Sequence, residues 1–276
     1  MNAPLQVAVT GPFDDQGSRT LRFLQEAARL GEVTVLLWPD DAALALDWKP
    51  LQFPLAERAY FLQALRYVKR VVPVKGEVLA HALPAVPGFS PNLWAIEEGR
   101  AGPAQRAFCQ QQGLACRELG GQQLRGFPPA EIAPAAVGAP RKKVVVTGTY
   151  DWFHSGHVRF FEEASSYGDL YVVVGHDANI RLLKGPGHPL IPEEERRYVV
   201  QSIRYVTEAL ISTGTGWLDA APEIERIKPD IYAVNDDGDK GGKREYCREH
   251  GIEYLVFLRL PAPGLARRSS TDLRGF

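Results

Sequence analysis

The sequence contains the same pattern twice, and this repeat constrains the fold more than any other feature. Residues 7–14, Val-Ala-Val-Thr-Gly-Pro-Phe-Asp, resemble residues 144–151, Val-Val-Val-Thr-Gly-Thr-Tyr-Asp. The offset is 137 residues (151 − 14 = 137), and it becomes 138 at the Arg-Tyr-Val segments 66–68 and 204–206 (204 − 66 = 138). Both halves finish on Leu-Arg-Gly-Phe. Matches in one order at nearly constant spacing do not arise by chance, so the chain is predicted to hold two versions of one domain.

Each half alternates between strand and helix patterns. In the second half, residues 143–147 form a short β-branched run, which is typical of a buried parallel strand. Val158, Phe161 and Ala164 recur at helical spacing. Further segments are predicted as strands at 170–174, 231–234 and 254–258, and as helices at 193–205 and 243–250.

This alternation predicts an α/β fold with two tandem Rossmann-like domains, each with a doubly wound parallel sheet. We expect the first domain at 1–127 and the second at 141–276. Residues 128–140 are rich in Pro and Ala and are predicted to link the two. Ligands of such sheets bind beyond the carboxyl ends of the strands.

Composition excludes several classes of protein. A formal net charge of −1 over 276 residues does not favour a partner made of nucleic acid or an anionic membrane surface. The three cysteines are scattered and fit neither a disulfide framework nor a zinc site. No apolar stretch is long enough to insert in a membrane, and residues 1–12 lack the pattern of a signal peptide. We therefore expect a cytoplasmic protein.

The chemistry is predicted where the first strand of the second half ends, at residues 148–157. Two imidazoles, His154 and His157, stand three residues apart at the start of a helix and can face the same way. The free N–H groups and the positive end of that helix attract anions. Gly156 has no side chain, so a phosphate could approach the backbone closely. This arrangement favours an anion whose negative charge grows during a reaction.

The segment His154-Ser155-Gly156-His157 resembles the His-x-Gly-His signature of the cytidylyltransferase-like nucleotidyltransferases. The resemblance covers residues 143–274. Residues 184–186, Lys-Gly-Pro, followed by Glu-Glu-Arg at 194–196, look like the next block of ethanolamine-phosphate and glycerol-3-phosphate cytidylyltransferases. Residues 204–206 resemble a further block, and residues 268–273 resemble the C-terminal Ser-Thr-Thr loop of the family.

The resemblance implies that a substrate phosphate oxygen attacks the α-phosphate of a nucleoside triphosphate, with pyrophosphate as the leaving group. His154 and His157 would donate hydrogen bonds to the α-phosphate and the bridging oxygen, and Lys184 would neutralise charge. The implied nucleotide-binding residues are Gly148, Thr149, Tyr150, Asp151, Phe153, Gly156, Asn235, Asp236, Arg268, Ser269, Ser270 and Thr271. A Mg²⁺ ion is expected on the triphosphate, and no direct protein ligand for it is assigned.

Two details stay open at the level of sequence. Asn235 and Asp236 follow a strand, either as the base-reading loop that the resemblance implies or as a simple turn. The stretch before Ser269 is longer than the family pattern implies, so Arg259, Arg267 and Arg268 all compete for the phosphates.

The first half lacks the implied machinery. At the positions of His154, Gly156 and His157 it has Gly17, Arg19 and Thr20, it lacks the Ser-Ser-Thr loop, and the position of Lys184 falls near residues 48–49 without the following Gly-Pro. It is therefore predicted to be a degenerate copy with a structural role, packed on the second half as an internal pseudo-dimer. A homodimer of the whole chain is a further expectation.

The leading prediction is transfer of CMP from CTP to a small phosphorylated alcohol. The alternative within the enzymes is an adenylyltransferase that uses ATP and a heptose 1-phosphate or an FMN-like acceptor, because motifs around phosphates do not read the base. An alternative of another class is a non-catalytic nucleotide sensor, a hypothesis suggested by the degenerate first half.

Overall fold

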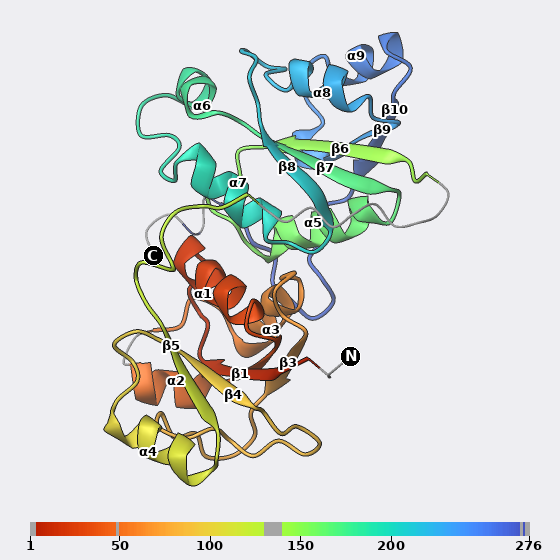
Figure 1. The fold of residues 1–276 in the computed structure, drawn as a ribbon. Coiled ribbons are helices and arrows are strands. Elements are labelled where there is room, and N and C mark those ends of the chain that lie inside the picture. Colours follow the sequence, from red (N-terminus) through yellow and green to blue (C-terminus); the bar gives the residue numbers. More distant parts are fainter. Residues whose placement is uncertain (1–3, 48–49, 130–139, 271–272, 274–276) are drawn as a thin grey trace. The chain divides into compact units, whose positions relative to one another are not determined.

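The computed structural model describes residues 4–47, 50–129, 140–270 and 273. The chain divides into two compact units, Met1–Gly126 and Phe127–Phe276 (Figure 1). Each unit holds a five-stranded parallel sheet with helices around it. The predicted fold class is confirmed. Most of the predicted linker, residues 130–139, lies outside the described residues.

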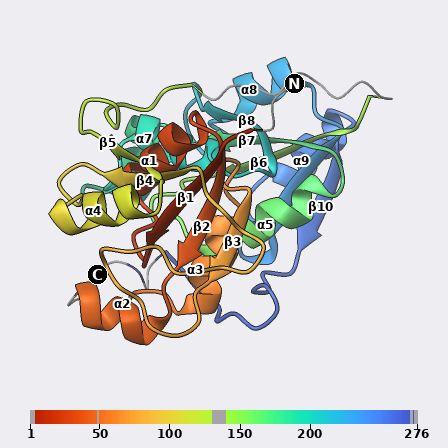
Figure 2. The ribbon, with the colours of Figure 1, turned by 60° about the horizontal axis from the view of Figure 1, so that its bottom comes forward.

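The first unit alternates strands and helices along its whole length. Its sheet has the order β3-β2-β1-β4-β5, so β1 lies between β2 and β4 (Figure 2). The elements are β1 (Gln6–Gly11), α1 (Ser18–Ala28), β2 (Glu32–Leu37), α2 (Asp40–Asp47), α3 (Leu55–Gln63), β3 (Arg70–Pro73), β4 (Leu93–Glu97), α4 (Pro103–Gln111) and β5 (Ala115–Leu119).

The second unit repeats this arrangement. Its sheet order is β10-β9-β6-β7-β8, which from the β8 edge is the order of the first sheet. The elements are β6 (Lys143–Gly148), α5 (Ser155–Ser165), β7 (Asp169–Val174), α6 (Asp177–Lys184), α7 (Glu193–Gln201), β8 (Val206–Ile211), α8 (Ala221–Ile227), β9 (Ile231–Asn235), η1 (Asp236–Gly238), α9 (Lys243–Glu249) and β10 (Glu253–Phe257).

The central strand β6 of the second unit is buried on both faces. Its three consecutive valines at 144–146 are fully buried. Val145 belongs to a cluster with Ile224 of α8 and Cys247 of α9, while α5 and α7 cover the opposite face (Figure 1). A strand covered on both sides needs an unbroken apolar run rather than an alternating one, which explains the Val-Val-Val sequence.

The helix predicted at 193–205 ends four residues early, at Gln201. The chain turns there because β8 must begin at Val206 to pair with β7. The Gln201 side chain stabilises the turn by accepting a hydrogen bond of 2.6 Å from the backbone N–H of Ala209. The Arg-Tyr-Val segment therefore forms the turn and the first residue of β8 rather than the end of a helix.

One buried arginine fastens the same loops in each unit. Arg196 of α7 and Arg58 of α3 are 1% and 0% exposed. In the second unit the guanidinium donates to the carbonyls of Thr149, Gly175 and Ile191 and to the carboxylate of Asp177. In the first unit it donates to the carbonyls of Pro12, Trp38 and Phe53 and to the carboxylate of Asp40. The acceptors correspond one to one at the repeat offsets.

A second correspondence involves glycines before β2 and β7. A Cβ atom added to Gly31 would lie 2.2 Å from the carbonyl oxygen of Leu5, and one added to Gly168 would lie 2.0 Å from that of Lys142. Only glycine fits either position, because the chain crosses closely over the start of the central strand. The two units therefore share these close contacts at matching positions of the sequence repeat.

Candidate active site

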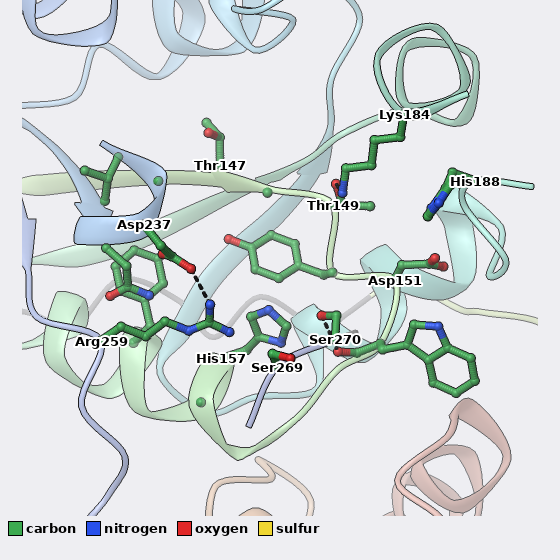
Figure 3. Close-up of a pocket in the computed structure, with 18 of the residues that line it drawn as sticks. Thr147, Thr149, Asp151, His157, Lys184, His188, Asp237, Arg259, Ser269 and Ser270 are labelled. Atoms are coloured by element: carbon green, nitrogen blue, oxygen red, sulfur yellow. Dashed lines mark hydrogen bonds and ion pairs between the residues drawn. The ribbon is translucent and has the colours of Figure 1, made fainter. Parts of the chain in front are cut away.

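A pocket of about 470 Å³ opens at the carboxyl ends of β6 and β9 in the second unit (Figure 3). This is the edge where parallel sheets of this kind bind ligands. Strand β6 supplies its floor, the amino end of α5 supplies one wall, and the segment after β9 supplies another. We refer to it as the second-unit pocket.

His154 starts helix α5 and is itself fully buried. It is the N-cap residue, with φ −152° and ψ 172°, and its Nδ1 accepts a hydrogen bond of 3.1 Å from the backbone N–H of Gly156. An accepting Nδ1 places the proton of a neutral imidazole on Nε2. His154 is not among the residues that line the pocket.

Gly156 is required by this cap. A Cβ atom at position 156 would lie 2.9 Å from Nδ1 of His154, a contact that side chains do not tolerate. From the sequence, we expected Gly156 to let a phosphate come close to the backbone. In the structure, the missing side chain lets the His154 ring pack against the Gly156 backbone. Gly156 nevertheless lines the pocket.

His157 lies one turn further and lines the pocket. Its ring stacks on that of His154, with centroids 3.9 Å apart and planes inclined by 26°. Phe153 stacks on it at 5.2 Å, and Tyr150 meets it edge-on at 5.2 Å. Three neighbouring rings fix one orientation of the imidazole. Its Nδ1 is buried and has no hydrogen-bond partner within the described parts of the chain.

The pKa of His157 is lowered well below 6.5. Loss of hydration by burial is the main cause, followed by the charges of His154, Arg259 and Lys184. The ring is therefore neutral near pH 7 while the pocket is empty. A bound anion would offset the nearby positive charges and give the imidazole N–H an acceptor.

Asp151 anchors the loop that follows β6 through hydrogen bonds of its carboxylate. This carboxylate is 6% exposed, and its Oδ1 accepts the backbone N–H groups of Leu190 and Ile191 at 2.9 and 2.8 Å. Tyr150, just before it, has a positive φ of 55° and is also buried. Asp14 binds the amides of Gln52 and Phe53 in the same way in the first unit. Asp151 therefore anchors the segment before α7 to the end of β6.

Three cationic side chains from separate elements line the pocket, and Figure 3 shows two of them, Lys184 and Arg259. Lys184, at the end of α6, donates a hydrogen bond of 2.9 Å to Oγ1 of Thr149. Lys243, at the start of α9, donates to the carbonyl of Gly238 at 2.9 Å, and burial lowers its pKa. Arg259 follows β10 and is the third. Together with the positive end of α5, they favour a polyanion.

Of the three arginines left open by the sequence, Arg259 is the one that lines the pocket. Its guanidinium pairs with the carboxylate of Asp237 and donates to the carbonyl oxygen of Arg268 at 3.1 Å. Arg267 is exposed, and neither it nor Arg268 lines the pocket. Arg259 therefore both faces the pocket and holds the C-terminal loop across it.

The pocket gathers most of the residues that the sequence indicated. Those that line it are Gly148, Thr149, Tyr150, Asp151, Gly156, His157, Lys184, Asn235, Ser269 and Ser270. Four lie outside the lining: Phe153, His154, Asp236 and Arg268. Thr271 lies outside the described residues. The C-terminal loop reaches the pocket partly through Ser270, whose hydroxyl donates to the carbonyl of Trp152 at 3.2 Å.

Sequence reasoning missed Lys243, Asp237, Trp152 and His188, which also line the pocket. Lys243 had a usable signal, because it begins a predicted helix directly after a strand-end loop. Trp152 lies within residues 148–157, the segment in which the sequence predicted the chemistry. His188 had no signal, since the segment between α6 and α7 has no regular pattern.

The described residues contain no group of three or more His, Cys, Asp or Glu side chains placed to hold a metal ion. The two carboxylates that line the pocket are already engaged, Asp151 with backbone amides and Asp237 with Arg259.

No helix in the described part of the chain is long and apolar enough to cross a membrane.

Comparisons with known proteins agree with this chemistry. A family model described as cytidylyltransferase-like matches residues 145–274. The FAD synthase of Ferroglobus placidus is 44% identical over 118 residues, which cover 42% of this chain and 74% of that protein. The FAD synthase of Thermococcus kodakarensis is 38% identical over 137 residues, which cover 48% of this chain and 89% of that protein. The FAD synthase of Methanocella arvoryzae is 36% identical over 115 residues, which cover 41% of this chain and 78% of that protein.

The matched residues of the family model span the second-unit pocket, from β6 to the C-terminal loop. The predicted resemblance is therefore confirmed, and this chain belongs to the cytidylyltransferase-like family of nucleotidyltransferases.

Proposed function

We propose that the second unit transfers AMP from ATP to FMN and releases pyrophosphate, so that FAD is formed. The observation that carries the reaction class is the convergence of His157, Lys184, Lys243 and Arg259 on the amino end of α5. The choice of substrates is supported by the relatives named FAD synthase. FAD is FMN joined to AMP through a bond between their phosphates, which is the product of this type of transfer.

In the proposed reaction, an oxygen of the FMN phosphate attacks the α-phosphorus of ATP. A new P–O bond forms, the bond between the α-phosphorus and the bridging oxygen breaks, and pyrophosphate leaves with the electron pair. Neutral His157 would donate a hydrogen bond to the α-phosphate as its negative charge grows. The enzyme contributes position and fixed charge rather than a covalent intermediate.

For His154 we propose a positioning role in place of the donor role that the resemblance implied. It is buried, it caps α5 and it stacks on His157. We assign it to positioning, since it fixes both the helix start and the plane of the imidazole that faces the pocket.

The β- and γ-phosphates would lie between Lys184, Arg259 and the Ser269–Ser270 segment. Two hydrogen bonds support this assignment because they fix both ends of the segment. Arg259 donates to the Arg268 carbonyl, and the Ser270 hydroxyl donates to the Trp152 carbonyl. Mg²⁺ would neutralise part of the triphosphate charge. Because the pocket carboxylates are engaged, phosphate oxygens would supply its ligands.

The alternative of CMP transfer to a phosphorylated alcohol is less well supported. The pocket groups that face phosphates would serve either nucleotide, but the relatives compared above are all named FAD synthase.

A substrate matrix tests the proposal. The full chain is incubated with Mg²⁺ and either ATP or CTP, against FMN, ethanolamine phosphate, glycerol 3-phosphate and a heptose 1-phosphate, and pyrophosphate release is measured. We expect turnover with ATP and FMN and the appearance of FAD by chromatography. Turnover only with CTP and a phosphorylated alcohol would overturn the substrate assignment while leaving the reaction class intact.

A further inference from the structure

The first unit holds a cavity of its own at the matching edge of its sheet. This first-unit cavity has a volume of about 530 Å³ and lies at the carboxyl ends of β1 and β4. Much of its lining corresponds to that of the second-unit pocket: Phe23 and Ile96, for example, stand where Phe160 and Val234 line that pocket. A cavity of this size lies within the range of about 300–1,000 Å³ found for small-molecule sites.

The phosphate-binding side chains of the second unit are absent from this cavity. Gln105 lines it at the position of Lys243 (243 − 138 = 105), and Thr20 at that of His157 (157 − 137 = 20). Leu46, the penultimate residue of α2, lines it near the end of that helix, whereas the matching helix α6 ends on Lys184. One lysine and the imidazole have thus been replaced by uncharged groups that attract anions far less.

The helix start that would receive a phosphate is covered by the protein itself. Asp15 Oδ1 accepts the backbone N–H of Gly17, the N-cap of α1, at 2.7 Å. Arg19, at the position of Gly156, pairs with Glu97 at 2.5 Å, and Arg100 lies 3.8 Å from the same carboxylate. The cavity arginines are therefore matched by Glu97, and Asp15 already occupies the positive end of the helix. A triphosphate would meet the carboxylates of Asp14, Asp15 and Glu98 in this cavity without the cations of the second-unit pocket.

The remaining walls suit an aromatic ring that carries N–H donors. Four aromatic side chains line the cavity: Phe13, Phe23, Trp38 and Trp94. Trp38 is fixed by a hydrogen bond of 2.7 Å from its Nε1–H to Thr10. Flat aromatic walls stack on ring systems. Glu97 and Glu98 line the cavity beside them and can accept hydrogen bonds from an amino group.

We propose that the first unit binds a nucleoside that bears an amino group and lacks phosphates. The two units would then have opposite charge preferences, with affinity falling from adenosine to AMP to ATP in the first-unit cavity and rising in the second-unit pocket. This inference does not depend on the reaction proposed for the second unit.

The test uses 8-azidoadenosine as a photoaffinity probe on the full chain, with the labelled peptides identified by mass spectrometry. We expect label in peptides from residues 10–105, removed by excess adenosine and retained in excess ATP. Label that is confined to residues 147–270 or absent would overturn the proposal. Equal protection of residues 10–105 by ATP and adenosine would also overturn it.

Two variants on one helix make the test specific. Leu44 and Leu46 of α2 are 48% and 36% exposed, but only Leu46 lines the cavity. Leu46→Trp places a bulky ring in the cavity and is expected to weaken labelling of the first unit at least tenfold. Leu44→Trp is expected to label as the wild type does. Circular dichroism checks that both variants fold, and equal labelling of the two folded variants would contradict the site assignment.

Discussion

His154 and His157 stand three residues apart, and their rings stack at 3.9 Å, yet only His157 lines the pocket. The sequence motif correctly predicted a helix start with two adjacent imidazoles. It could not assign the rings separately, because their directions depend on the N-cap backbone. At His154 the extended φ and ψ turn the ring back onto the Gly156 amide.

His157→Ala tests the role of the pocket imidazole. We expect kcat to fall about a hundredfold or more, because one fixed donor to the growing charge is lost. The matched control is His250→Ala, an exposed histidine at the end of α9 that lies outside the pocket. Steady-state pyrophosphate release measures both. Unchanged kcat in His157→Ala would contradict the role assigned to this imidazole.

The lowered pKa of His157 also predicts how stability depends on pH. Between the lowered value and about 6.5, the unfolded chain binds a proton at this residue and the folded chain does not. The free energy of unfolding should therefore decrease as the pH falls below about 6.5, by at most about 1.4 kcal/mol per pH unit. Above that pH the residue contributes no dependence.

Urea denaturation of the wild type and His157→Gln at pH 7.5 and pH 5.5 measures this effect. The wild type should lose more stability on acidification than the variant. Equal losses would show that the imidazole is not desolvated as described.

Arg259 and Arg267 form a matched pair for the phosphate contact. Arg259→Ala should raise KM for the nucleotide at least tenfold, because it removes both a pocket charge and the contact that holds the C-terminal loop. Arg267→Ala should leave KM within about twofold, because that side chain is exposed and outside the pocket. Initial rates over a range of ATP concentrations measure this, and the reverse ranking would contradict the placement of Arg259.

At the scale of elements, the loops that follow β6 and β7 are held in place from α7. Arg196 ties the ends of β6 and β7 to the start of its own helix through four hydrogen bonds. The Glu-Glu-Arg block was recognised in the sequence, but as a likeness to a family rather than as a structural contact. Its function was hidden because three of its four acceptors are backbone carbonyls, which leave no trace in residue identity.

Arg196→Met removes this fastening without opening a large cavity. Because it leaves Asp177 and buried carbonyls without their donor, the free energy of unfolding of the second unit should fall by about 3–5 kcal/mol. Arg248→Met is the control, since Arg248 is exposed and pairs with Glu245 at the surface, and it should cost less than about 1 kcal/mol. Chemical denaturation followed by circular dichroism compares them; a loss in Arg196→Met no larger than in the control would contradict the proposed fastening.

Strand positions were predictable because buried parallel strands carry continuous β-branched runs, as in residues 144–146. Element ends were less predictable. The α7 helix stops at Gln201 because β8 must pair with β7, a tertiary requirement that no local pattern encodes. The sequence placed Lys243 at the start of a predicted helix after a strand-end loop, but only the packed sheet brings that helix start to the end of β6.

At the scale of the whole molecule, the repeat predicted the duplicated fold and part of its chemistry. The conserved features are those that build the domain, such as the Asp14 and Asp151 anchors and the buried Arg58 and Arg196. The features that differ are those that line the ligand edge, as with Gln105 in place of Lys243. The sequence indicated a loss of catalysis in the first unit, but it could not show that a cavity remains, because a cavity is a property of packed side chains.

The central claim is that the second unit joins the α-phosphate of a nucleoside triphosphate to an acceptor phosphate. The most direct measurement follows two labels separately, by supplying the full chain with FMN and either [α-³²P]ATP or [γ-³²P]ATP. We predict that the α label enters FAD and that the γ label leaves entirely in pyrophosphate. Transfer of the γ label to the acceptor, or release of inorganic phosphate without a labelled dinucleotide, would contradict the account.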